Sequence, residues 1–133
     1  MLIDWSAEFD LWLDRLIERA NSGDAAAATQ LDLVYAELEY LQELKEAPSE
    51  DTATLKRVRQ SRTNPVWRVA HPFRAGIAIR LIVWFPPERP NQVVVALFAG
   101  DKANMGDVFY DSVGTRADAA IASYRMQYGG ERP

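Results

Sequence analysis

The sequence has no cysteine and only one histidine, His71, among its 133 residues. Without thiols the chain can form no disulfide and offers no thiolate to zinc, and a single imidazole is too few for a histidine-based metal site. The chain also lacks a glycine-rich phosphate-binding loop and the partner groups that a cysteine or serine nucleophile needs. We therefore expect neither a metal ion nor another cofactor.

Long apolar stretches are missing as well. No run approaches the roughly 18 uncharged apolar residues of a membrane-spanning helix. The first residues, Met-Leu-Ile-Asp-Trp, do not show the basic segment followed by an apolar one that marks a secretion signal. The expectation is a soluble, cytoplasmic protein with one domain that spans residues 1–133.

Charge is distributed unevenly along the chain, although the net charge is only −4. Residues 1–51 contain thirteen acids and three bases, whereas residues 52–87 contain seven bases and no acid. Such a basic block can present a positive face to a polyanion even on an acidic protein. Alternatively, the basic strands pair with acidic helices and the charges cancel within the molecule. Both interpretations fit the sequence.

The most hydrophobic part of the chain consists of three runs, at residues 66–70, 77–85 and 92–100. They are rich in β-branched and aromatic residues and are separated by short segments with Pro, Gly or Asn, which is typical of an antiparallel meander. Arg80 interrupts the second run. A guanidinium at this position needs an anion or water, because an unpaired buried charge costs several kcal/mol.

Two helices are expected before the meander. A short strand at residues 2–5 leads to Ser6, a suitable N-cap, and apolar residues then recur at helical spacing up to Ala20. Asp24 caps a second predicted helix that continues to about Glu46. Its core-facing stripe is predicted to be Leu31, Val34, Leu38 and Leu41, with Tyr35, Glu37, Glu39, Glu43 and Glu46 on the flanks.

The remaining segments give weaker signals. Residues 54–59 are predicted as a strand, 101–106 as a polar loop and 108–110 as a short extended piece. A last helix is expected after Gly114 and Thr115, with an apolar face from Ala117 to Tyr128. The order of these elements indicates an α+β fold, in which an N-terminal helical hairpin packs on a three- or four-stranded antiparallel sheet with a C-terminal helix.

Several short motifs, in this order, resemble the RelE/ParE superfamily of bacterial toxins, particularly its RelE- and HigB-like branches. The stretch Asp-Trp-Ser-Ala-Glu-Phe at residues 4–9 is similar to the family's opening. Residues 66–69 and 79–83 resemble two of its central strands, residues 95–102 a strand that ends in a basic loop, and residues 107–128 its closing segment. The similarity extends over nearly the whole chain.

The resemblance implies a toxin of a toxin–antitoxin system. Proteins of the RelE-like branch are endoribonucleases that enter the ribosome and cut mRNA without a metal, with the ribose 2′-OH attacking the adjacent phosphate. The expected partners are a cognate antitoxin, the ribosome and mRNA, and operator DNA through the antitoxin. The alternative is a binding module on the same fold, either a gyrase-type inhibitor or a partner that grips an antitoxin, since fold does not determine function.

Four residues are candidates for the catalytic site. Arg80 falls on the family's strand arginine, which contacts the scissile phosphate; the alternative is that it pairs with a carboxylate of the second helix, Glu39 or Glu43. Lys102 lies where the family has a basic residue, and Tyr110 where it often has a catalytic or base-stacking tyrosine. His71 is a candidate general acid or base because imidazole titrates near neutrality.

A further group of cations is predicted to bind the RNA backbone on either side of the cut. The alternative is that they are solvated charges at strand edges. These residues are Lys56, Arg57, Arg59, Arg68 and Arg74.

Overall fold

The computed structural model describes residues 1–59, 61, 63–69 and 79–129, and at residues 101–111, 128 and 129 it describes the backbone without the side chains. The elements follow one another as β1 (Leu2–Trp5), α1 (Ala7–Asn21), α2 (Ala25–Glu43), β2 (Leu55–Arg57), β3 (Val66–Val69), β4 (Ile79–Trp84), β5 (Val93–Asp101), α3 (Lys102–Tyr124) and the π-helical turn η1 (Arg125–Gly129). No helix among the described residues is both long enough and apolar enough to cross a membrane.

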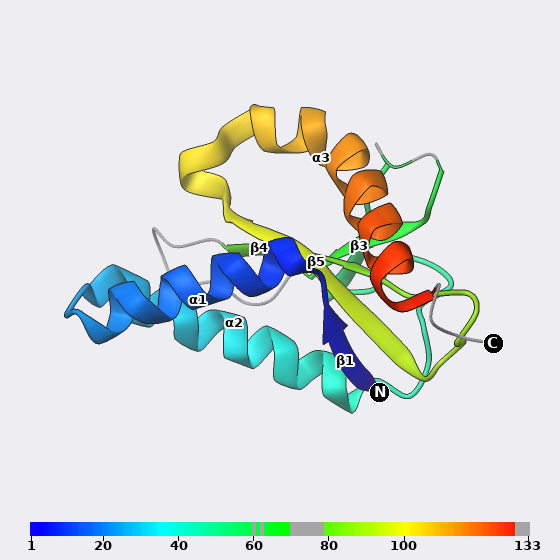
Figure 1. Cartoon of the computed structure of the whole chain (residues 1–133), viewed down its shortest axis with the longest axis horizontal. Coiled ribbons are helices and arrows are strands. Elements are labelled where there is room, and N and C mark those ends of the chain that lie inside the picture. The colour runs from blue at the N-terminus through cyan, green and yellow to red at the C-terminus, as the bar shows by residue number, and fades with distance from the viewer. Residues whose placement is uncertain (60, 62, 70–78, 130–133) are drawn as a thin grey trace.

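The two N-terminal helices begin at the predicted caps. The Ser6 hydroxyl accepts a hydrogen bond from the backbone N–H of Phe9, and the Asp24 carboxylate accepts one from Ala27. Between the helices, Gly23 adopts a φ of 99°, a conformation that costs glycine little and other residues more. As Figure 1 shows, α1 and α2 then lie along each other, which orients their apolar stripes toward the same side.

The described strands form one mixed sheet in the order β1-β5-β4-β3-β2. The pairs from β2 to β5 are antiparallel, whereas β1 is parallel to β5. The predicted α+β class is confirmed, but the sheet has five strands and is not purely antiparallel. The short first strand was expected. Its parallel pairing with β5, the last strand along the chain, was not expected.

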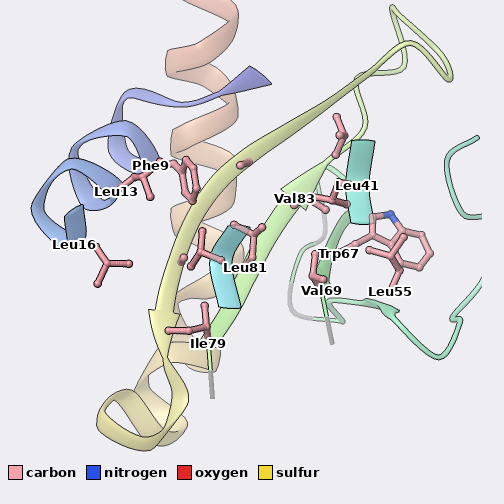
Figure 2. Close-up of a cluster of buried hydrophobic side chains, with 14 of the residues drawn as sticks. Phe9, Leu13, Leu16, Leu41, Leu55, Trp67, Val69, Ile79, Leu81 and Val83 are labelled. Atoms are coloured by element: carbon pink, nitrogen blue, oxygen red, sulfur yellow. The ribbon is translucent and has the colours of Figure 1, made fainter. Parts of the chain in front are cut away.

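Helices cover both faces of the sheet. Alternate residues along each strand point to opposite faces, so Leu81 and Val83 join one apolar cluster with α1 and α2, while Ile82 and Trp84 join another with α3. Figure 2 shows the first cluster, with side chains from both N-terminal helices and from β2, β3 and β4. Each fully buried large side chain contributes roughly 1.5–3 kcal/mol to folding.

The C-terminal region differs from the prediction. The backbone from Lys102 to Tyr124 is helical, so the predicted polar loop at 101–106, the extended piece at 108–110 and the helix start after Thr115 are wrong. The sequence favoured a loop because Asn104, Gly106 and Asp107 have low helix propensity. Propensity is a weak constraint compared with tertiary packing, and the second half of α3 packs on β4 and β5.

Candidate functional site

The strand register places three of the predicted cations on one face of the sheet. Lys56 on β2 pairs directly with Arg68 on β3, and Arg68 pairs with Ile82 on β4. Arg80 lies two residues before Ile82 and therefore points to the same side. We call Lys56, Arg68 and Arg80 the cationic face; all three are half-buried, and they share the side of the sheet on which α3 packs.

The other candidate residues are not brought to this face. Arg57 pairs with Trp67, and the side chain of Trp67 belongs to the cluster with α1 and α2. Arg57 itself is exposed at the edge of the sheet. Arg59 is exposed beyond the end of β2. Lys102 begins α3 and Tyr110 follows in the same helix, but the structure does not describe their side chains. His71 and Arg74 lie outside the described residues.

Packing at the cationic face includes an unfavourable pair. Lys56 and Arg68 are directly opposite each other on antiparallel strands, and like charges in this arrangement destabilise a sheet. Ion pairs between described residues join Arg116 to Glu8 and Arg125 to Glu88, and neither includes Lys56 or Arg68. Within the described part of the chain, Lys56 and Arg68 therefore have no acidic partner that cancels their charge.

Glu37 on α2 is a titratable residue near the site that the sequence interpretation placed wrongly. It was predicted on a flank of the helix, yet only 2% of it is exposed, and its Oε2 has no hydrogen-bond partner among the described atoms. The sequence did contain a signal. Val34, Glu37 and Leu41 follow one another at i, i+3 and i+7, so Glu37 lies on the buried stripe of α2.

The electrostatics of Glu37 are coupled to those of Arg80. Burial raises the pKa of Glu37 from 4.5 to about 8, and the positive charge of Arg80 opposes this rise by favouring the ionised form. The expected partners of Arg80 in the second helix were Glu39 or Glu43, but both are exposed. With this pKa, Glu37 is mostly protonated at pH 7.

A second group of charged and aromatic side chains lies beside the cationic face and was not predicted as a site. The Cζ of Arg116, on α3, lies 4.2 Å from the ring centroid of Phe98, on β5. Arg116 also donates a hydrogen bond to Glu8 of α1. These residues line a cleft of about 180 Å³ between α1, β5 and α3, together with Leu11, Trp12, Arg15 and Ala99. We call it the α1–α3 cleft.

The chemistry available to the described site is that of anion binding. Guanidinium and ammonium groups bind phosphate oxygens and stabilise charge that develops on them. Among the described residues, no group of three or more His, Asp or Glu side chains is placed to hold a metal ion. Glu37 is buried, so it responds to the charge of Arg80 and is not exposed to a ligand.

Comparisons with protein-family models, with curated proteins and with solved structures found no match to this chain.

Proposed function

We propose that this protein is a RelE/HigB-like toxin, a metal-independent endoribonuclease that cuts mRNA on the ribosome and so inhibits translation. The observation that carries the proposal is the cationic face. Lys56, Arg68 and Arg80 come from three neighbouring strands and point to the same side of the sheet. A row of three cations on neighbouring strands suits the closely spaced phosphates of a nucleic acid.

The order of the elements supports the same proposal. A strand, two helices packed together, an antiparallel run of strands and a final helix follow in the sequence expected of the RelE-like, microbial-RNase-like fold. Within this order, Arg80 is on the central strand where the resemblance expects an arginine at the scissile phosphate. The proposed role of Arg80 is to stabilise the extra negative charge of the phosphate during attack by the 2′-OH.

The proposed roles of the remaining candidates follow from the resemblance. Lys102 assists at the phosphate, and Tyr110 or His71 moves a proton or stacks on a base. The proposed partners are a cognate antitoxin, the ribosome with its mRNA, and operator DNA through the antitoxin. An acidic antitoxin segment on the cationic face would compete with RNA for the same charges.

The test is inducible expression in a bacterial host, with the wild type beside Arg80→Ala and Arg19→Ala. Arg19 is a matched control because it is an exposed arginine on α1, remote from the cationic face. We expect growth arrest and new mRNA ends at ribosome-occupied codons for the wild type and Arg19→Ala, and neither for Arg80→Ala. Equal thermal stability of the purified variants would show that folding is not the cause.

A binding module without catalysis is the second candidate, and the environment of Arg80 favours it. Arg80 is half-buried and electrostatically coupled to the buried Glu37, as a structural arginine would be. On this hypothesis the protein acts by gripping another protein, such as a gyrase or an antitoxin. Growth arrest without new mRNA ends, and with Arg80→Ala as toxic as the wild type, would support the second candidate and contradict the first.

A further inference from the structure

The α1–α3 cleft lies beside the part of β5 that no longer pairs with β1. β1 pairs with β5 only from Val93 to Ala96, and the Ser6 backbone N–H then donates to the Ala96 carbonyl at 2.9 Å as the chain turns into α1. Beyond this point no described strand pairs with the outer edge of β5. The first turns of α1 and a side chain of α3 border this edge and form the cleft over Phe98 and Ala99.

The residues of the cleft are arranged for a planar, anionic ligand. On α1, Glu8, Trp12 and Arg15 recur at i, i+4 and i+7, so they lie along one side of the helix. Arg15 is exposed and makes no ion pair with any described residue. Arg116 is held from two sides, by the ring of Phe98 and by the carboxylate of Glu8. A guanidinium fixed with one face on a ring offers its other face for stacking.

The cleft and the cationic face lie on neighbouring strands of the sheet. Phe98 lies in the same row as Arg68, separated from it only by Ile82. With strands about 4.8 Å apart, the backbones at Arg68 and Phe98 are roughly 10 Å from each other. Arg80 pairs with Gly100, the neighbour of Ala99 in the cleft wall. A chain of phosphates on the cationic face would therefore have to extend across two strand spacings, roughly 10 Å, to reach the cleft.

From this geometry we infer that the α1–α3 cleft is a subsite for one nucleotide of single-stranded RNA, which stacks its base on Arg116 and places its phosphate beside Arg15. The inference rests on the proposed function, since it extends the RNA path from the cationic face. A volume of about 180 Å³ suits one base and is small for an added peptide strand. Stacking between a base and an aromatic or guanidinium plane tolerates any base, so the subsite contributes affinity more than sequence preference.

The test measures binding by fluorescence anisotropy, with a fluorescein-labelled, fully 2′-O-methylated single-stranded RNA that has no 2′-OH to attack its phosphates. We expect Arg15→Ala to weaken binding about tenfold, as loss of a charge-assisted contact does. Arg19→Ala removes the same charge from the next turn of α1, away from the cleft, and is expected to bind like the wild type. Arg116→Lys keeps the charge but loses the planar group, and we expect about fivefold weaker binding.

A second probe separates stacking from charge. An oligomer of the same length without bases should bind the wild type and Arg116→Lys equally, because neither can then stack a base. If Arg116→Lys weakens binding of this oligomer as much as it weakens binding of the RNA, stacking in the cleft is excluded.

The result with Arg80→Ala distinguishes the failure of this inference from the failure of the proposed function. If Arg80→Ala weakens RNA binding while Arg15→Ala behaves like Arg19→Ala, the cleft is not a subsite and the proposed function stands. If the wild type binds no RNA, both fail. If it binds an acidic peptide through Arg15 instead, the cleft is a peptide site and the inference is wrong.

Discussion

Glu37 is an ionisable residue in an apolar, buried environment. It occupies a core position of α2 between Val34 and Leu41, both of which are fully buried. An ionised carboxylate there would lack solvation, and the protein avoids this cost at neutral pH by keeping the carboxyl protonated. A leucine or glutamine would fill this position without such a cost, so the carboxyl is a feature that stability alone does not explain.

The pH dependence of stability should reveal this group. Below pH 4.5 Glu37 is protonated in both the folded and the unfolded state; between 4.5 and about 8 it is protonated only in the folded state. Folding then takes up a proton, so this group makes the free energy of unfolding fall as pH rises through that window, by at most about 1.4 kcal/mol per pH unit. We expect Glu37→Gln to remove this contribution and to be more stable than the wild type at pH 8.5. Urea denaturation across this range checks it.

Glu39→Gln is the matched control for this measurement, because Glu39 lies on the same helix but is exposed. It should keep the wild-type pH profile. A Glu37→Gln profile that also matches the wild type would show that the carboxyl of Glu37 is not protonated in the folded state.

The coupling between Glu37 and Arg80 leads to a prediction about RNA binding, if the proposed function is correct. When pH rises through about 8, Glu37 becomes ionised and compensates part of the Arg80 charge. We expect RNA affinity of the wild type to fall between pH 7 and pH 9, and that of Glu37→Gln to change less. Anisotropy titrations at constant ionic strength measure both. Parallel declines in the two proteins would mean that another group is responsible.

At the scale of elements, the junction between β1 and α1 is tied to the centre of the sheet. The buried hydroxyl of Ser6 accepts from the N–H of Phe9 and donates to the carbonyl of Leu97. One side chain thus caps the helix and satisfies a backbone carbonyl of β5 where β1 ends. Asp24 caps α2 in the same manner but at an exposed position.

The two caps should therefore differ in their contribution to stability. We expect Ser6→Ala to lower the free energy of unfolding by about 2 kcal/mol, because it removes a cap and leaves a buried carbonyl without its donor. Asp24→Ala should cost about 1 kcal/mol, the usual value for a cap. Urea denaturation of the two variants measures the difference. Equal losses would indicate that the bond from Ser6 to Leu97 contributes nothing.

The elements that could be predicted from the sequence are those with a local signal. Ser6 and Asp24 mark the helix starts, and the strands around residues 66, 80 and 95 are recognisable by their composition. The parallel pairing of β1 with β5 depends on contacts across the whole chain and has no local signal. The helix from Lys102 was missed because its first turns contain residues of low helix propensity. Only tertiary packing makes the helical conformation favourable there.

The candidate site was predictable to a smaller extent than the fold. Arg80 could be recognised, since a charge in an apolar strand is conspicuous in any sequence. Its alignment with Lys56 and Arg68 required the register of three strands, β2, β3 and β4. The α1–α3 cleft joins Arg15 and Arg116 from opposite ends of the chain, and no spacing in the sequence relates them.

At the scale of the whole molecule, the acidic and basic parts of the sequence are separated in space. The acid-rich residues 1–51 supply α1 and α2, which cover one face of the sheet, while Lys56, Arg68 and Arg80 point to the other. The net charge of −4 is therefore the sum of an acid-rich pair of helices and a strand face that carries three cations, together with the mixed charges of the other segments. Long-range repulsion between the acidic side and RNA would orient the approach of an RNA strand toward the cationic face.

Salt should consequently act on stability and on RNA binding in opposite directions. Screening weakens the repulsion between Lys56 and Arg68, so adding salt should slightly stabilise the fold. The same screening should weaken RNA binding: three phosphate contacts to a single strand predict a slope of log affinity against log salt of about −2.

We expect Arg68→Thr to reduce the magnitude of this slope by about 0.7 and to raise the free energy of unfolding by roughly 0.2–1 kcal/mol at low salt. Denaturation and anisotropy titrations over one salt series test both effects, with Arg19→Thr as the control that should change neither. A variant that loses stability together with RNA affinity would show that Arg68 serves the fold and not an anionic ligand.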